Sequence, residues 1–201
     1  MSVILALETT SDVCAVAIGT VESCVLESCN APREHNRRIL PMIDAACASL
    51  GIDRQAIACV AFSAGPGSFT GVRLGAAVAQ GVATGTNAQI YGAPTSLCMG
   101  ERVFRLTRQT GEFVVQRVSR RDLVYEARLN HDGEHCRFES TDRLVKQDEF
   151  DGSCQVFHDT LVPLCAFDVM TLATRHELDW QSPAHALPIY VEGDHPWRPT
   201  S

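Results

Sequence analysis

The sequence contains no run of eighteen apolar residues, no C-x-x-C pair and no excess of basic side chains. Without such an apolar run, no membrane-spanning helix is expected. The nine cysteines are odd in number and lack the spacing of a disulfide framework, which favours free thiols in a reducing compartment. The apolar opening, residues 1–7, has no basic leader and ends at Glu8, so we expect no export signal and a cytoplasmic location.

The charge balance disfavours direct binding of nucleic acid. Seventeen basic side chains against twenty-four acidic ones give a formal charge of −7, the wrong sign for holding phosphates. The best candidate for a local basic patch is the run Arg117, Arg120 and Arg121, which we interpret as a solvated strand end. With 45% apolar residues, the 201-residue chain can bury a core without metal or disulfides, as one unit or as two small lobes.

The hydrophobic pattern predicts a mixed α/β protein. Strands are predicted at 3–8, 13–19, 21–28, 57–64, 88–92, 113–118, 122–130 and 135–139, and helices at 33–50, 67–84 and 166–176. Gly51 ends the first helix, and Pro41 marks either a kink or a later start. This order is typical of a duplicated α/β unit of the ribonuclease-H-like, actin-like kind. We expect one lobe at 1–100, possibly completed by 183–201, and a smaller one at 101–182.

The first two helices have little polar surface. Between residues 39 and 50 the clearly polar side chains are Asp44 and Ser49, and between residues 72 and 83 they are Arg73 and Gln80. A helix that is apolar all round must be covered on both sides, and a sheet covers only one. We therefore expect these helices to form a contact with another protein chain.

A stripe of small residues at spacing four runs along the second helix: Gly67, Gly71, Gly75, Ala79 and Ala83. Such a stripe lets another backbone come close. It either packs inside the molecule, against the first helix or the sheet, or lines the contact with a partner, and we predict the second. The predicted contact residues are His35, Ile39, Met42, Ile43, Ala46, Gly71, Val72, Gly75, Ala76, Ala79 and Val82.

Two segments resemble phosphate-binding loops without completing one. Residues 64–73 join a strand to a helix and are rich in glycine, but lack the Lys-Ser/Thr of a P-loop and the dinucleotide fingerprint. Thr9, Thr10 and Ser11 follow the first strand, where their hydroxyls either contact a nucleotide weakly or cap the turn; capping is favoured. No convincing second loop occurs near 151–153. The sequence therefore indicates no cofactor and no catalytic residue.

Residues 131–135, His-Asp-Gly-Glu-His, match the H-x-x-E-H pattern of zinc peptidases. That chemistry needs a helix, so that both imidazoles share a face. Asp132-Gly133 between strand-like flanks instead predicts a hairpin turn with these residues at an exposed tip. The pattern is therefore interpreted as a turn and not as a metal site.

Four segments together resemble the TsaB (YeaZ) family. They are residues 4–10 (Ile-Leu-Ala-Leu-Glu-Thr-Thr), 32–41 with Pro-Arg-Glu-His and Ile-Leu-Pro, 65–73 (Gly-Pro-Gly-Ser-Phe-Thr-Gly-Val-Arg) and 188–191 (Pro-Ile-Tyr-Val). The likeness is close over residues 1–95 and looser up to residue 197.

The resemblance implies an actin-like fold and a non-catalytic role beside the catalytic paralogue TsaD and the ATPase TsaE. That assembly places threonylcarbamoyl on the adenosine beside the anticodon of tRNAs that read codons beginning with A. TsaD carries a metal-binding H-x-x-x-H where residues 93–100 here have no histidine. The resemblance further implies pairing through the first two helices, with TsaD or in a homodimer, and contact with tRNA only through the complex.

Two alternatives remain open. The chain could be an actin-like nucleotide-binding protein or ATPase that acts alone, which would need two phosphate loops and an acidic metal partner. It could instead be a metallopeptidase, which would need a bound metal.

Overall fold

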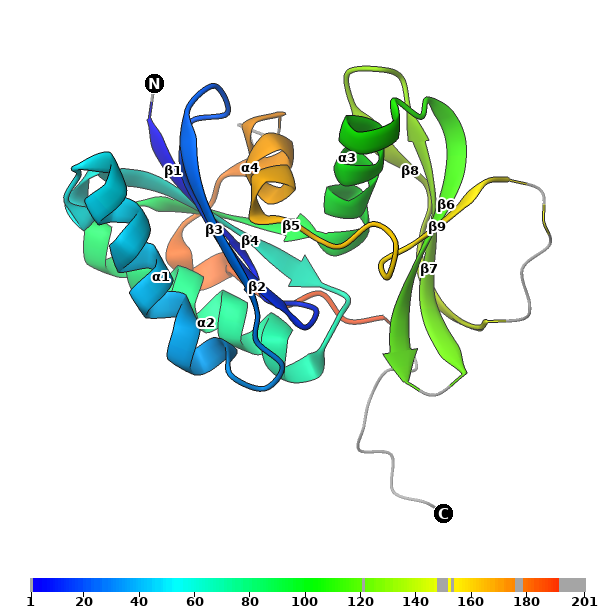
Figure 1. Cartoon of the computed structure of the whole chain (residues 1–201), viewed down its shortest axis with the longest axis horizontal. Coiled ribbons are helices and arrows are strands. Elements are labelled where there is room, and N and C mark those ends of the chain that lie inside the picture. Colours follow the sequence, from blue (N-terminus) through cyan, green and yellow to red (C-terminus); the bar gives the residue numbers. More distant parts are fainter. Residues whose placement is uncertain (1, 121, 148–151, 153, 176–178, 192–201) are drawn as a thin grey trace, which may run out of the picture.

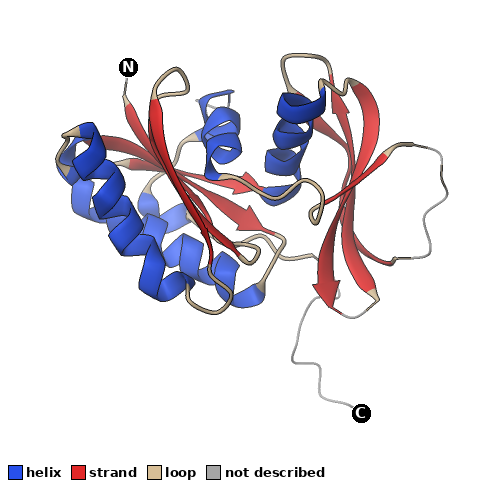
Figure 2. Ribbon diagram, viewed as in Figure 1, coloured by secondary structure: helices blue, strands red, loops and turns tan. Residues whose placement is uncertain are grey.

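The structure is a computed structural model that describes residues 2–120, 122–147, 152, 154–175 and 179–191. Two β-sheets with helices around them form the molecule (Figure 1; Figure 2). The strands are β1 Val3–Glu8, β2 Val13–Gly19, β3 Cys24–Asn30, β4 Ile57–Gly65, β5 Gln89–Pro94, β6 Gly111–Arg120, β7 Leu123–His131, β8 Cys136–Lys146 and β9 Val156–His158. The helices are α1 His35–Leu50, α2 Phe69–Thr86, α3 Thr95–Thr107 and α4 Ala166–Arg175, with short 3-10 turns η1 Arg54–Ala56 and η3 Pro183–His185.

The first sheet has the strand order β3-β2-β1-β4-β5. β1 lies at its centre, antiparallel to β2 and parallel to β4. Leu5 and Leu7 face the core under α1 and α2, whereas Ile4 and Ala6 face the opposite core. Because both faces are covered, the strand is apolar at nearly every position, and the prediction of a buried central strand at 3–8 is confirmed.

Helices cover both faces of this sheet. α1 and α2 lie on one face, and α4 lies on the other, beside α3 (Figure 1). α3 also contacts the second sheet, whose order is β8-β7-β6-β9. The core between the sheets includes Met99 of α3, Phe113 of β6 and Leu129 of β7. Among the helices in the described part of the chain, none is both long enough and apolar enough to cross a membrane.

Several elements differ from the sequence prediction. The third strand begins at residue 24 instead of 21, because Thr20 and Ser23 exchange two backbone hydrogen bonds and close the turn. α1 starts at His35, so Pro41 lies inside the helix and does not mark a late start. β9 and α3 were not predicted. In α3, Gly100 interrupts the helical pattern of the sequence. A glycine is needed at this position because a Cβ would lie 2.3 Å from the Cys136 sulfur.

The packing also crosses the expected boundaries between lobes. The expected second lobe, 101–182, included α4, but α4 lies against β1, β2 and β4 of the first sheet. Residues 183–191 return to the first sheet, where the Ile189 N–H donates to the Ala64 carbonyl at 2.7 Å. Residues 192–201 and residue 176 of the predicted third helix lie outside the described residues.

The small-residue stripe of α2 faces the chain's own sheet. A Cβ at Gly71 would lie 2.0 Å from the Thr9 carbonyl oxygen, and one at Gly75 would lie 2.6 Å from the Thr9 hydroxyl. Ala79 and Ala83 have no exposed surface. The expectation that this stripe sets the approach of a partner is therefore wrong, because β1 and β4 already occupy that side of the helix.

This packing predicts opposite effects for two glycines of the same helix. Gly71→Ala should lower the free energy of unfolding by about 1–3 kcal/mol or more, because the methyl group overlaps a backbone atom. Gly81→Ala should raise it by roughly 0.5–1 kcal/mol, because a Cβ there meets nothing within 4 Å and alanine is the better helix former. Urea denaturation of both variants measures the difference. Equal effects would contradict the assigned face of α2.

Candidate functional site

A buried carboxylate lies where β1 ends. Glu8 has no exposed surface, and its Oε1 accepts the Thr10 N–H and the Thr10 hydroxyl, each at 2.6 Å. Its Oε2 accepts the Ser63 hydroxyl of the parallel strand β4. Because the carboxyl ends of parallel strands meet at one edge of the sheet, these groups converge there. Burial raises the pKa of Glu8, while the hydrogen bonds and the Arg117 charge oppose the rise.

The residues predicted as possible nucleotide contacts bind the chain itself. The Thr9 hydroxyl donates to the Gly71 carbonyl at 2.8 Å, and the Thr10 carbonyl accepts the Ser68 N–H at 2.8 Å. Thr9 and Thr10 are buried. Ser11 is half-buried, and its hydroxyl accepts the Val13 N–H at 3.2 Å. The turn after β1 therefore holds the start of α2, and its hydroxyls cap backbone groups.

Arg117 of β6 joins the two sheets. Its guanidinium donates to the Pro66 carbonyl, to the Ser96 hydroxyl at 3.0 Å and to the Asp142 carboxylate at 3.2 Å. Arg117 is only 3% exposed. The interpretation of the basic run as a solvated strand end is therefore wrong for this residue. Arg121 lies outside the described residues. The run gave no signal that one arginine would be buried, because all its partners are distant in sequence.

A cleft of about 630 Å³ opens beside this arginine, between the two sheets. Ser11 and Asp12 line it from the turn between β1 and β2, Ser68 and Phe69 from the N-terminal end of α2, and Asp159 from the segment after β9. One carboxylate oxygen of Asp159 is buried without a hydrogen-bond partner, and burial raises the pKa of this group. The cleft is lined by the two carboxyl groups of Asp12 and Asp159 and by the single guanidinium of Arg117, which is already paired with Asp142. This charge pattern is unfavourable for a polyphosphate.

The predicted partner-contact residues fall into two groups. Nearly all are covered by the chain's own sheet: His35, Ile39, Ile43, Ala46, Gly71, Val72, Gly75, Ala76 and Ala79 are buried. Met42 and Val82 are half-buried and lie closer to the surface. The prediction therefore selected the inner side of both helices, because the strongest apolar periodicity marks the core face.

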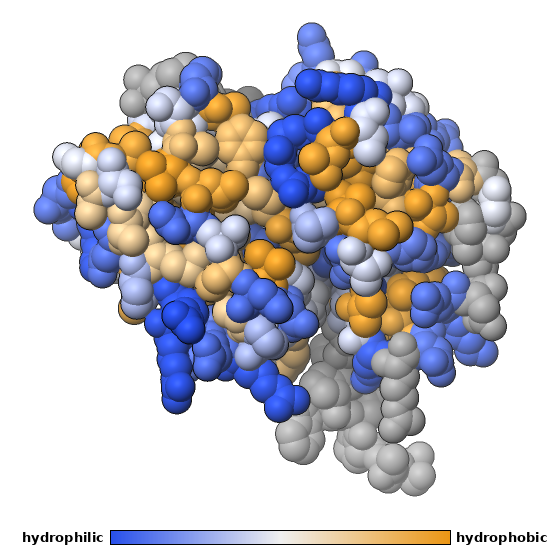
Figure 3. Space-filling model, in the orientation of Figure 1, coloured by the Kyte–Doolittle hydropathy of each residue, from blue (hydrophilic) through white to orange (hydrophobic). Residues whose placement is uncertain are grey.

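The outer side of the same helices carries several apolar residues, and sequence reasoning selected none of those that are exposed. Polar residues lie among them, since α1 also exposes Arg37, Arg38 and Asp44. α1 exposes Leu40, at 48%, together with Pro41 and Ala45. α2 exposes Ala77 and Gly81. Leu74, Val78 and Val82 extend this side as half-buried residues. In Figure 3 the upper part of the face that carries α1 is largely tan and orange, whereas its lower part, where α1 begins, is hydrophilic. We refer to the eight apolar residues as the outer helix surface.

The zinc-peptidase pattern forms a hairpin turn between β7 and β8, as predicted. Its histidine His131 is not exposed, however. The imidazole has no exposed surface, stacks on Phe104 with ring centroids 3.9 Å apart, and accepts the Gly133 N–H at 3.0 Å. Burial lowers the pKa of His131. Within the described residues, no group of three His, Cys, Asp or Glu side chains could hold a metal ion.

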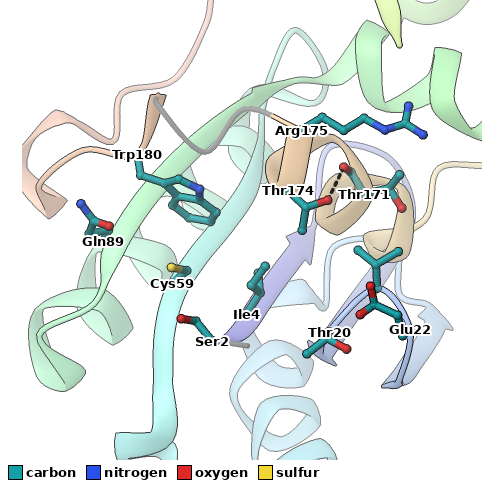
Figure 4. Close-up of a pocket in the computed structure, with 11 residues that line it drawn as sticks. Ser2, Ile4, Thr20, Glu22, Cys59, Gln89, Thr171, Thr174, Arg175 and Trp180 are labelled. Atoms are coloured by element: carbon teal, nitrogen blue, oxygen red, sulfur yellow. Dashed lines mark hydrogen bonds between the residues drawn. The ribbon is translucent and has the colours of Figure 1, made fainter. Parts of the chain in front are cut away.

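A second hollow, of about 690 Å³, lies on the α4 face near the start of β1 (Figure 4). Ile4, Cys59 and Trp180 form its apolar part, and Thr174 and Glu22 lie at its polar side. It shares no lining residue with the cleft beside Arg117. Its charged lining residues are Glu22, from the turn between β2 and β3, and Arg175, at the end of α4.

The buried Glu8 predicts a pH dependence of stability. Its pKa is raised in the folded chain from an ordinary value near 4.5, so the folded state binds the proton more tightly than the unfolded state. The contribution of Glu8 to the free energy of unfolding therefore falls as the pH rises from about 4.5 through the raised pKa. Glu8→Gln removes this titration, so the stability of the variant relative to the wild type should increase with pH. Urea denaturation between about pH 4.5 and 8 measures this, and parallel curves would contradict it.

Comparison with known proteins places the chain. The family model "TsaD: tRNA N6-adenosine threonylcarbamoyltransferase" matches residues 29–147, more than half of the chain. A protein named "tRNA threonylcarbamoyladenosine biosynthesis protein TsaB" from Escherichia coli (strain K12) is 41% identical over 105 residues, which cover 51% of this chain and 44% of that protein. The protein of the same name from Haemophilus influenzae is 39% identical over 103 residues, which cover 51% of this chain and 44% of that protein. The chain spans about half the length of the curated relatives it matches.

Solved structures show the same fold. One, described as an uncharacterized protein with similarity to peptidase YEAZ from Pseudomonas aeruginosa, has a TM-score of 0.84 at 23% identity, covering 96% of this chain and 100% of that chain. Another, YeaZ from Pseudomonas aeruginosa, has a TM-score of 0.82 at 24% identity, covering 95% and 100%. The two-sheet architecture is thus the actin-like α/β fold. The chain belongs to the family of the TsaD model, and its named relatives in that family are the TsaB (YeaZ) proteins.

Proposed function

We propose that this chain is a non-catalytic, cytoplasmic subunit in the synthesis of threonylcarbamoyladenosine in tRNA. It acts beside a TsaD-like catalytic paralogue and a TsaE-like ATPase, and meets tRNA through that complex. The names of its relatives support the pathway. The observation that carries the role of a binding subunit is the outer helix surface, a group of apolar residues on the side of both helices that the sheet leaves uncovered.

The outer helix surface has the properties of a protein contact. Contiguous apolar patches on a soluble protein mark interaction sites, and α1 and α2 contribute to this one side by side (Figure 1). Gly81 adds a second argument. A glycine inside a helix costs roughly 1 kcal/mol relative to alanine. Apart from the neighbouring residues and the adjacent backbone of α2 itself, no described atom lies within 4 Å of a Cβ at residue 81. A closely packed partner backbone would compensate this cost.

A stand-alone actin-like ATPase is the second candidate, supported by the cleft beside Arg117. The chemistry of that cleft argues against it. Thr9 and Thr10 use their hydroxyls within the chain, and Asp12 and Asp159 place negative charge where a polyphosphate would lie. Asp151 and Ser153, near the expected position of a second loop, lie outside the described residues. A peptidase is disfavoured further, because His131 is buried between its own hairpin and Phe104 of α3.

Two leucines of similar exposure provide a matched test of the surface. Leu40 on α1 is 48% exposed and Leu106 at the end of α3 is 52% exposed. Leu40→Arg should weaken association, with a TsaD-like paralogue or with a second copy, by at least about 100-fold, because it places an unpaired charge in an apolar contact. Leu106→Arg should leave association unchanged. Sedimentation of each variant, with circular dichroism to confirm folding, measures this. Equal effects of the two changes would overturn the proposed surface.

The role in tRNA modification has a separate test. We expect the chain, purified with a TsaD-like paralogue and a TsaE-like ATPase, to support formation of threonylcarbamoyladenosine, and to form none when alone. Mass spectrometry of nucleosides from the treated tRNA measures the product. ATP turnover by the isolated chain that disappears in Ser11→Ala would instead establish the ATPase alternative. Product formed by the chain alone would show that it is catalytic.

A further inference from the structure

Two cysteines lie directly opposite each other in the first sheet. Cys14 of β2 and Cys29 of β3 are Cα partners in the antiparallel ladder. Directly paired residues of a sheet point to the same face. Cys14 accordingly belongs to the core under α1 and α2, and Cys29 packs against that same core. The two thiols therefore approach each other from adjacent strands on one side of the sheet.

The hydrogen bonds of the hairpin fix the geometry of this pair. Thr20 and Ser23 exchange backbone hydrogen bonds of 2.9 and 3.2 Å, which makes them a hydrogen-bonded pair. Such pairs recur at every second position, so Cys14 and Cys29 are also one, with an expected Cα–Cα distance of about 5.5 Å. Disulfides span Cα–Cα distances of about 4.4–6.8 Å. The register thus matches a disulfide.

The sulfurs must still come closer than they stand in an ordinary ladder. Cβ atoms of facing residues are about 4.5–5.5 Å apart, against about 3.5–4.5 Å in a disulfide. β3 is an edge strand of the described sheet and pairs with β2 alone. It can therefore shift toward β2 without breaking a second ladder. The resulting bond should be strained, and a strained disulfide is easily reduced.

The two thiols differ in access. Cys14 has no exposed surface, and burial, followed by the Cys29 and Glu8 charges, raises its pKa to about 12. Cys29 is only half-buried, and its thiol donates to the Met42 sulfur at 3.8 Å. A reagent in solution therefore reaches Cys29 first, and Cys14 can react only with a group already held on Cys29.

We propose that Cys14 and Cys29 are a redox-sensitive pair that closes into a cross-strand disulfide in the presence of a small disulfide such as oxidised glutathione. The Cys29 thiolate attacks one sulfur of the reagent, whose S–S bond breaks and releases one glutathione thiolate. The Cys14 thiolate then attacks the Cys29 sulfur and releases the second glutathione. The protein gives up two protons and two electrons, and the reagent becomes two thiols.

Closure of the disulfide changes the contact beneath α1. The Cys29 sulfur would turn from the Met42 sulfur to that of Cys14, so the packing of β3 against α1 is altered. Formation of the Cys14–Cys29 disulfide does not depend on the proposed function. An effect of oxidation on partner binding would rest on that function, because Met42 lies under the outer helix surface.

The test is mapping of thiols under controlled redox conditions. The reduced protein is incubated with mixtures of reduced and oxidised glutathione, its free thiols are alkylated, and peptides are analysed by mass spectrometry without reduction. We expect one peptide pair joined through Cys14 and Cys29, with a loss of two hydrogens. Phenylarsine oxide, which bridges neighbouring thiols, should bind the reduced protein and protect the same two cysteines.

Two variants complete the test. Cys29→Ser should abolish the joined peptide and the arsenical protection, whereas Cys154→Ser, a half-buried cysteine before β9, should leave both unchanged. Circular dichroism confirms folding, and the arsenical result on the wild type stands without any variant. A glutathione adduct that remains on Cys29, with Cys14 recovered as an alkylated free thiol, would overturn the proposal. A disulfide formed only elsewhere would also overturn it. Cys24 and Cys165 are one such pair, since the Cys165 charge helps to raise the pKa of Cys24, after burial.

Discussion

The buried guanidinium of Arg117 is the interaction on which the relation of the two sheets depends. A charge at 3% exposure is tolerated only when it is paired and hydrogen-bonded, and the partners of Arg117 come from the loop after β4, from α3 and from β8. Each partner belongs to a different element, so the arginine holds the start of α2 and the second sheet in one arrangement. Glu8 contributes a second buried ionisable group to the same region.

This arrangement uses the polar groups that an actin-like cleft could offer to a nucleotide. The hydroxyls after β1 hold the backbone of α2, and the guanidinium is occupied by a carbonyl, a hydroxyl and a carboxylate. A ligand that competed for these groups would have to replace hydrogen bonds that maintain the fold. These polar groups are therefore better suited to holding the fold together than to binding a polyphosphate, which agrees with the proposed role of a binding subunit.

The outer helix surface and the cysteine pair lie on opposite sides of one layer. α1 packs on β2 and β3 with its inner side and offers Leu40 and Pro41 on its outer side. Cys29 and Met42 meet between them. Because a packed core transmits small shifts, a change in the strand pair beneath α1 can reach the surface above it. The proposed partner contact and the proposed redox chemistry are physically connected through this helix.

The sequence by itself determined the elements whose pattern is local. β1 is recognisable because a strand covered on both faces is apolar at nearly every position, and the hairpin at Asp132-Gly133 because its turn residues are specific. The family followed from short blocks such as residues 65–73. Only the tertiary structure decided which neighbour each apolar stripe meets. Spacing four places Gly71 and Gly75 on one side of α2, but it cannot distinguish a partner chain from the chain's own β1. Burial of Arg117 likewise depends on contacts between residues distant in sequence, which no local pattern encodes. The pairing of Cys14 with Cys29 depends on the register of the β2–β3 hairpin, which the sequence prediction did not give because it began the second strand of this hairpin at residue 21.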